Sequence, residues 1–257
     1  MTMFNSIFGG KPPPWVLDYE HFSGQIYIIG DVHGCLALLK GLEKKIEADA
    51  KGQGAESLLV YIGDLVDRGP ESYGVLAHLM SAPPEGFKRV CLMGNHEEMM
   101  LGFLDAPSRR AAWLDYGGFE TLLSYGALEN EIMLARANPR KMKSLIKRIV
   151  PQEHVDFLGG LAHAIRLKDF LISHAGGNPA KSIERQTVQD YLWGAGALPK
   201  APTDIQKDVI HGHFIVENAT NFAGIISIDT GAYRSGVLTA AKLGPNKTVE
   251  FISFSRQ

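Results

Sequence analysis

Cysteine is scarce in this chain, whose 257 residues include only Cys35 and Cys91. Neither belongs to a Cys-x-x-Cys pair, so we expect neither a disulfide framework nor a structural zinc site. Long hydrophobic runs are also missing. The short apolar stretch at 4–8 contains polar residues and runs into a proline-rich segment, which predicts neither a signal peptide nor a membrane span. We therefore expect a cytoplasmic protein that does not act at a membrane.

A marked excess of charge of one sign is absent as well. The chain has 26 Lys and Arg against 28 Asp and Glu, a net charge of -2. The densest basic segment, 141–148, has the spacing of the solvated face of a helix, so we expect no nucleic-acid partner. Apolar residues make up 45% of the 257 positions, which is enough to bury the core of one globular domain.

Three short apolar segments that each lead into a glycine alternate with helical patterns in the first hundred residues. The expected strands are residues 25–29, 58–62 and 90–93. Between them, apolar side chains recur at three- and four-residue spacing in 35–50, and 71–80 is the second expected helix. The alternation predicts parallel βαβ units, whose loops lie side by side at the sheet edge that binds ligands. We take 1–24 as a lead-in and 25–257 as one domain.

The second half of the chain has a different pattern. From about 99 to 160 it is helical and rich in Arg, Lys, Met and Leu, which predicts a helical insertion over the sheet edge. The strand patterns that follow are residues 164–167, 170–173, 208–211, 224–229, 236–243 and 248–253. Because these strands are closely spaced, we expect them to pair mainly antiparallel and to form a second sheet packed on the first. The expected fold class is α/β.

Polar side chains suited to metal binding follow several of the strands. The first three strands are followed by Gly-Asp-Val-His-Gly at 30–34, Gly-Asp-Leu-Val-Asp-Arg-Gly at 63–69 and Gly-Asn-His-Glu at 94–97. Two later strands end in His174 and in the pair His211 and His213. Carboxylates can bridge two ions, and a mixed set of carboxylates and histidines suits Mn, Fe or Zn. These sets predict two ions about 3.5 to 4 Å apart that could clamp phosphate oxygens.

Each of these features alone has an ordinary structural explanation. Glycine and aspartate are common where a strand meets a turn. Asn95 and Glu97 would also suit a helix N-terminus, with Asn95 as the cap and Glu97 favoured by the helix dipole. Five such sets at strand ends have no purely structural explanation, so their joint occurrence favours a metal site.

The motifs from Asp31 to His213 occur in the same order as in the phosphoprotein phosphatase branch of the metallophosphoesterases, and an Asp-Thr-Gly segment follows at 229–231. The chain therefore resembles this branch, especially its compact bacterial and phage members. The resemblance implies a calcineurin-like β-sandwich flanked by helices. It also implies two divalent metal ions, Mn foremost, with Fe or Zn as alternatives. The implied ligands are Asp31 and His33 for one ion, Asp64 as the bridge, and Asn95, His174 and His213 for the other.

The resemblance implies roles for four neighbouring positions as well. His96 corresponds to the general acid that protonates the leaving oxygen, and Asp67 to the carboxylate that orients it. Arg68 and Asn95 correspond to groups that contact the phosphate. Of the later histidine pair the family uses the second member, which leaves His211 as a candidate for supporting the ligands.

One departure from the family pattern concerns phosphate binding. Similar phosphatases carry a second phosphate-binding arginine shortly after a tryptophan, whereas Trp193 is followed here by Gly-Ala-Gly-Ala-Leu at 194–198. Arg234 is the replacement that we expect, because it follows the Asp-Thr-Gly segment and nearby glycines let the backbone approach closely. Arg185 is the second candidate.

These observations predict a metal-dependent phosphatase that hydrolyses phosphomonoesters, with phosphoserine, phosphothreonine or phosphotyrosine on proteins, or a small phosphoester, as substrate. The expected reaction is in-line attack of a metal-bridging hydroxide without a phosphoenzyme. A symmetrical dinucleoside tetraphosphate hydrolase is the alternative enzyme, because related bacterial enzymes share this core. A non-catalytic phosphate-binding module is a different class of function. Such a module would be expected to have lost a ligand or His96, and all are present.

Overall fold

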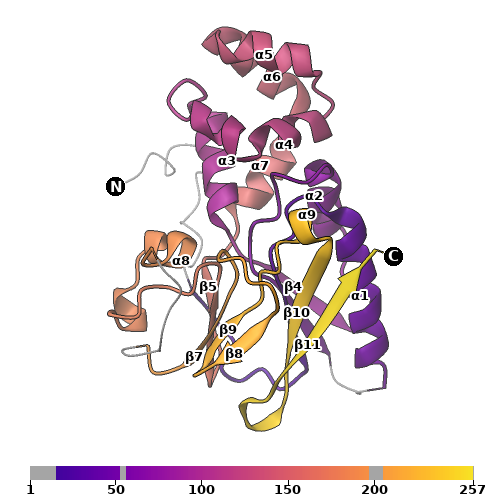
Figure 1. The fold of residues 1–257 in the computed structure, drawn as a ribbon, viewed down its shortest axis with the longest axis vertical. Coiled ribbons are helices and arrows are strands. Elements are labelled where there is room, and N and C mark those ends of the chain that lie inside the picture. Colours follow the sequence, from indigo (N-terminus) through magenta and orange to yellow (C-terminus); the bar gives the residue numbers. More distant parts are fainter. Residues whose placement is uncertain (1–15, 53–55, 197–204, 257) are drawn as a thin grey trace.

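Two β-sheets packed face to face form the centre of the protein. The computed structural model describes residues 16–52, 56–196 and 205–256. In these residues one sheet has five strands in the order β11-β10-β2-β3-β4, and the other has six in the order β1-β5-β6-β7-β9-β8. Helices α1 and α2 lie beside the first sheet, α8 lies beside the second, and α3 to α7 stand over one end of the sandwich (Figure 1). This is the expected sandwich flanked by helices.

The first sheet contains the expected parallel βαβ units. Its parallel strands are β2 (Ile26–Ile29), β3 (Ser57–Tyr61) and β4 (Phe87–Cys91), and its crossovers are α1 (Leu36–Ala50) and α2 (Ser72–Met80). Both faces of β2 are buried, because Ile26 and Ile28 enter the core between the sheets while Tyr27 and Ile29 pack against the helices. Burial on both faces explains why β2 and β3 read as nearly continuous apolar runs.

The last two strands join the first sheet, so their expected place in the second sheet was wrong. Strand β10 (Val237–Leu243) pairs antiparallel with β2, and β11 (Val249–Ser255) pairs antiparallel with β10. In β10, Leu238 and Ala240 face the helix side while Ala241 faces the core between the sheets. Alternation along a strand shows that both faces are covered, but it carries no information about which neighbouring strand accepts the backbone hydrogen bonds.

The second sheet is mixed, and the expectation of mainly antiparallel pairing was also wrong. Its strands are β1 (Val16–Asp18), β5 (Ala164–Arg166), β6 (Phe170–Ser173), β7 (Asp208–His211), β8 (Thr220–Phe222) and β9 (Ile225–Ser227). Three of its five pairs, β1 with β5, β6 with β7, and β7 with β9, are parallel. The connection from β6 to β7 contains η3 (Ile183–Arg185) and α8 (Val188–Trp193), and a connection of that length permits a parallel crossover.

Strand β1 also changes the expected start of the domain. Residues 16–18, which the sequence placed in a lead-in, form an edge strand beside β5. The rest of the expected lead-in, 1–15, lies outside the described residues.

A group of helices follows β4. It consists of α3 (Asn95–Asp105), η2 (Ala111–Tyr116), α4 (Gly118–Ser124), α5 (Glu129–Arg136), α6 (Pro139–Ile149) and α7 (Gln152–Gly159). Helix α6 buries Met142, Leu145 and Ile146 and exposes its lysines and arginines, as expected of a solvated basic face. Two short elements near the end are α9 (Ala232–Ser235) and η4 (Pro245–Lys247). No helix in the described part of the chain is long and apolar enough to cross a membrane.

Candidate active site

The structure brings together the six side chains expected to bind metal. Asp31, Asp64 and Asn95 follow β2, β3 and β4 of the first sheet, whereas His174 and His213 follow β6 and β7 of the second. These strands are parallel within each sheet, so their carboxyl ends face the same side of the molecule. Five of the six residues are nearly inaccessible to solvent, and His213 is partly buried.

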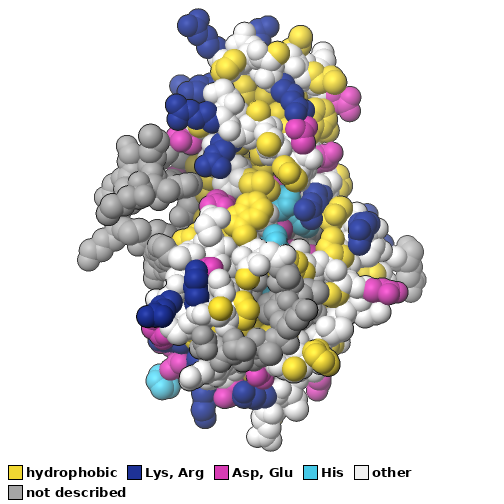
Figure 2. Space-filling model, turned by 60° about the vertical axis from the view of Figure 1, so that its left-hand side comes forward, with side chains coloured by type: hydrophobic (Ala, Val, Ile, Leu, Met, Phe, Trp, Pro, Cys, Tyr) yellow, Lys and Arg dark blue, Asp and Glu magenta, His cyan; other side chains and the backbone are white. Residues whose placement is uncertain are grey.

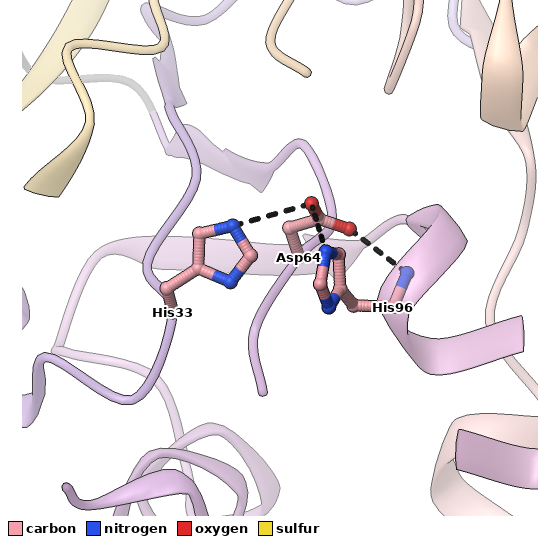
Figure 3. A group of neighbouring side chains, drawn as sticks. All are labelled: His33, Asp64 and His96. Carbon is pink, nitrogen blue, oxygen red and sulfur yellow. Dashed lines mark hydrogen bonds and ion pairs between the residues drawn. The ribbon is translucent and has the colours of Figure 1, made fainter. Parts of the chain in front are cut away.

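Asp64 lies at the centre of this cluster. Two groups of side chains have ligand atoms close enough together to hold a metal ion, one made of His33, Asp64 and His96 and the other of Asp64, His174 and His213. Asp64 Oδ2 is 3.3 Å from His33 Nε2, and Asp64 Oδ1 is 3.3 Å from His174 Nε2 (Figure 3 shows the first group). The two oxygens of one carboxylate therefore face two different groups, as a bridging ligand requires.

A backbone hydrogen bond from the loop after β7 fixes one oxygen of Asp31. Its Oδ2 accepts a hydrogen bond from the backbone N–H of His213 at 3.0 Å, while its buried Oδ1 has no hydrogen-bond partner among the described residues. Burial and the neighbouring charges of Asp229 and Asp64 raise the pKa of Asp31 well above its usual value. A buried, unpaired carboxylate oxygen beside other carboxylates and neutral histidines fits a divalent cation.

Asn95, His174 and His213 meet at the other side of Asp64. His174 Nε2 is 2.8 Å from Asn95 Oδ1, and His213 Nδ1 is 3.0 Å from the same oxygen. Burial lowers the pKa of His174 to about 3, and it lowers the pKa of His213 as well. Both rings are therefore neutral near pH 7, which is the form of histidine that binds metals.

His33 is turned toward the cluster by a hydrogen bond at its other end. Its Nδ1–H donates to the carbonyl oxygen of Val66 at 2.9 Å, so the lone pair of Nε2 points toward Asp64 and Arg68. An imidazole fixed in this way presents one chosen nitrogen to a metal.

His96, Asp67 and Arg68 form a second unit beside the ligand cluster. His96 Nδ1 donates to Asp67 Oδ2 at 2.7 Å, and the Arg68 Nη2–H donates to His96 Nε2 at 2.9 Å. Burial opposes charge on His96, but Asp64 and Asp67 outweigh it and raise its pKa. The helices after β4 fix Asp67, since Trp113 and Thr121 each donate to its carboxylate at 2.7 Å.

Glu97 fixes the turn that carries Asp64, a contact that the sequence did not reveal. Its carboxylate is fully buried and accepts the backbone N–H groups of Gly94, Asp64, Leu65 and Val66 at 2.8 to 3.2 Å. Gly94, not Asn95, is the N-cap of α3, and Glu97 is the third residue of that helix. Burial and the charge of Asp64 raise the pKa of Glu97 to about 7.

Backbone strain is concentrated at these loops. Nine non-glycine residues of the described ranges have positive φ, and five of them are predicted site residues: His33, Asp64, Asp67, Arg68 and His213. Left-handed backbone is costly for residues with a side chain and persists where surrounding contacts enforce it. Close packing adds a further constraint, because a Cβ on Gly94 would collide with Asp64, and one on Gly212 with Asp31.

Three predicted residues lie apart from this cluster. Arg234 on α9 and Arg185 at the end of η3 are exposed, and neither side chain makes an ion pair or hydrogen bond within the described ranges. His211 is buried but turned away, with its ring nitrogens bonded to the Gly212 carbonyl and to Ser227. The end of the segment after Trp193, 197–198, falls outside the described residues.

Two aromatic residues that the sequence did not single out as site residues border the cluster instead. The Tyr233 ring is 5.3 Å from the His33 ring, and the guanidinium of Arg68 lies 4.8 Å from the Tyr233 ring centre. The Trp193 ring is 6.2 Å from the ring of His213. In Figure 2, histidine side chains reach the surface near the middle of the face, next to basic and hydrophobic side chains.

Comparison with known proteins gives the same family. Residues 24–224 match the family model described as calcineurin-like phosphoesterase. Serine/threonine-protein phosphatase 1 of Salmonella typhimurium is 30% identical over 225 residues, which cover 85% of this chain and 91% of that protein. A symmetrical bis(5'-nucleosyl)-tetraphosphatase of Pseudomonas putida is 27% identical, with 83% of this chain and 88% of that protein covered.

Solved structures show the same fold at lower identity. A cold-active protein-tyrosine phosphatase of a psychrophilic Shewanella aligns with a TM-score of 0.59 at 18% identity, covering 93% of this chain and 82% of that one. A protein serine/threonine phosphatase of Saccharomyces cerevisiae aligns with a TM-score of 0.57 at 14% identity, covering 99% and 87%. The sandwich with its cluster of carboxylates and histidines, the family match and these relatives agree, and the chain belongs to the calcineurin-like phosphoesterase family.

Proposed function

We propose that this phosphoesterase is a metal-dependent protein phosphatase that hydrolyses phosphoserine and phosphothreonine, and also phosphotyrosine. The observation that supports it most is the position of Asp64 between two ligand groups, beside the His96–Asp67 pair. Bridging and proton donation are the two needs of a phosphomonoester hydrolase that works without a covalent intermediate.

Two divalent ions are part of the proposal, with Mn foremost and Fe or Zn as alternatives. Their ligands would be Asp31 and His33 for one ion, Asp64 for both, and Asn95, His174 and His213 for the other. When bound, such a pair would neutralise phosphate charge and lower the pKa of a water molecule enough for it to attack phosphorus. His96 belongs to the first group by distance, so it stands close to any phosphate held there.

The protein's own side chains would bind and protonate the substrate. Arg68 would direct its guanidinium fork at two phosphate oxygens, with Asn95 contacting a third. In the structure the Arg68 N–H groups donate to His33 Nε2 and His96 Nε2, so a bound phosphate would replace these nitrogens as acceptor. Arg234 is the further phosphate-binding residue of the proposal, reached by reorientation of its exposed side chain.

Proton transfer follows from the contacts of His96. As the bond between phosphorus and the ester oxygen breaks, the proton on Nε2 would pass to the leaving oxygen, which departs as an alcohol or phenol. The incoming water supplies the new oxygen of the phosphate. Asp67 accepts the Nδ1–H of His96 at 2.7 Å, which orients the ring and favours its protonated form.

The test is a comparison of substrates on the Mn-loaded protein. We expect release of phosphate from phosphoserine and phosphothreonine peptides, complete loss after chelation, and recovery when Mn is added back. Hydrolysis of diadenosine tetraphosphate with no release of phosphate from any phosphopeptide would contradict the proposal. That result would favour the second candidate, a symmetrical dinucleoside tetraphosphate hydrolase, for which the Pseudomonas putida relative is the supporting observation.

A further inference from the structure

Two exposed aromatic side chains border the candidate site, and each contacts a different one of its two histidine groups. Tyr233 contacts His33 and Arg68, whereas Trp193 contacts His213. Each side chain is 37% exposed, so each keeps a surface that solvent or a ligand can reach. A molecule bound between the two histidine groups would therefore come within reach of an aromatic ring on either side.

Both rings are held in place by contacts of their own. The Nε1–H of Trp193 donates to Glu98 Oε2 at 2.8 Å, and Gln189 donates to the other oxygen of Glu98 at 2.8 Å. Tyr233 is held by the cationic face contact with Arg68 and by the edge of His33. Rings that are already ordered lose little conformational freedom when a ligand packs against them.

We propose that Tyr233 and Trp193 bind an aromatic group in the leaving part of the substrate, which gives the enzyme a preference for aromatic phosphoesters. This inference rests on the proposed phosphatase function. Aromatic rings prefer offset or edge-to-face packing at centroid distances of about 4.5 to 7 Å, and a phenol ring and a nucleobase both offer such faces. Phosphotyrosine is one source of that ring, and the base of a nucleotide is the other.

The decisive experiment compares two peptides of identical sequence that carry either phosphotyrosine or phosphoserine. We expect the wild type to favour the phosphotyrosine peptide in kcat/KM. Tyr233→Ala and Trp193→Ala should each reduce that preference by roughly 2- to 12-fold, the worth of one aromatic pair. Tyr233→Phe and Trp193→Phe keep a ring and should keep most of the preference. Phe222→Ala is the matched control, because Phe222 is 75% exposed on β8 and pairs with the first residue of β9, at the end of the second sheet opposite the cluster.

A parallel measurement identifies the source of the ring. The same variants are assayed with diadenosine tetraphosphate and with inorganic tripolyphosphate, which has the anhydride but no base. Loss of preference for the dinucleotide assigns the rings to a nucleobase, and loss of preference for phosphotyrosine assigns them to a phenol.

Equal losses on both members of each substrate pair, or no change in either preference, would overturn the inference. Failure of the proposed function gives a different result, since the wild type would then release phosphate from neither peptide. The dinucleotide and tripolyphosphate pair would still decide whether the rings bind an aromatic group.

Discussion

The turn at 63–69 and the turn at 229–236 both follow a strand, and each contains an arginine that the sequence predicts to bind phosphate. The two arginines differ in their contacts. In the first turn, Glu97 accepts three backbone N–H groups of the turn and Arg68 donates to two histidines. In the second, Arg234 is exposed and its neighbour Tyr233 contacts the cluster. The buried hydrogen bonds of the first turn fix the direction of the Arg68 side chain. In the short exposed helix of the second turn, neighbouring side chains face different directions, so Tyr233 contacts the cluster and Arg234 does not.

The largest effect that we expect is at the centre of the first turn. Asp64→Asn replaces a carboxylate between two ligand groups with a neutral amide that cannot balance two dications. We expect kcat to fall by about 100- to 1000-fold, the scale of losing a major electrostatic partner of the transition state, together with a loss of bound metal. Activity and metal content per chain are the measurements. Near-normal turnover with two metals retained would contradict the bridging role.

The next effect concerns the acid beside that turn. His96→Asn should keep bound metal but lose about 100-fold in kcat on alkyl phosphates, the lower end of the contribution of general acid catalysis. Aryl phosphates, whose leaving oxygen is a weaker base, should lose much less. The measurement is kcat for a series of esters with leaving groups of increasing basicity. A loss that is the same across the series would mean that His96 does not donate the proton.

A smaller effect tests whether the buried network itself is what distinguishes the first turn. Each carboxylate oxygen of Glu97 accepts hydrogen bonds from two backbone N–H groups. Glu97→Gln replaces one of these oxygens with an NH₂ group, which cannot accept them. We expect metal affinity and kcat to fall by about 10- to 100-fold, as when other residues that orient metal ligands are changed. Glu98→Gln is the matched control on the next residue of α3, and it should retain metal affinity. Unchanged affinity in Glu97→Gln, measured by competition with a chelator, would show that the turn holds its shape without this carboxylate.

The smallest effect is expected in the second turn. Arg234→Ala should raise KM for phosphomonoesters and weaken inhibition by free phosphate by roughly 2- to 5-fold, since an exposed charge contact is worth under about 1 kcal/mol. Metal content should not change. If phosphate inhibition is unaltered in Arg234→Ala but weaker in Arg185→Ala, the role moves to Arg185. No effect in either variant would leave Arg68 as the arginine that binds phosphate.

Much of the candidate site was visible in the sequence because its residues follow strands. Asp31, Asp64 and Asn95 were placed side by side from the parallel βαβ pattern alone, and the structure confirms that placement. Their roles in metal binding stay predictions. The contacts of Glu97 and Tyr233 with the site were not predicted, because they join residues that are far apart in the chain. No local sequence pattern indicates from which backbone N–H groups a buried carboxylate will accept hydrogen bonds.

The fold class was predicted correctly, but part of the strand pairing was not. The positions of most strands were correct, but β10 and β11 were assigned to the wrong sheet and the second sheet was expected to be mainly antiparallel. Strand patterns record burial, which is local, whereas pairing partners are set by packing of the whole chain. The short strand β8 was missed because all three of its residues are exposed.

The place of β10 has a consequence for synthesis of the protein on the ribosome. The second half of β10 pairs with all four residues of β2, although the two strands lie near opposite ends of the sequence. Until β10 emerges, β2 is an open edge with unpaired backbone groups on a strand whose four residues are all apolar or aromatic. Pairing across such a sequence separation is slow to form. The nascent chain therefore passes through a stage in which its loops with Asp31 and Asp64 already exist but the sheet beneath them is unfinished, and this is the stage at which aggregation or chaperone binding is most to be expected.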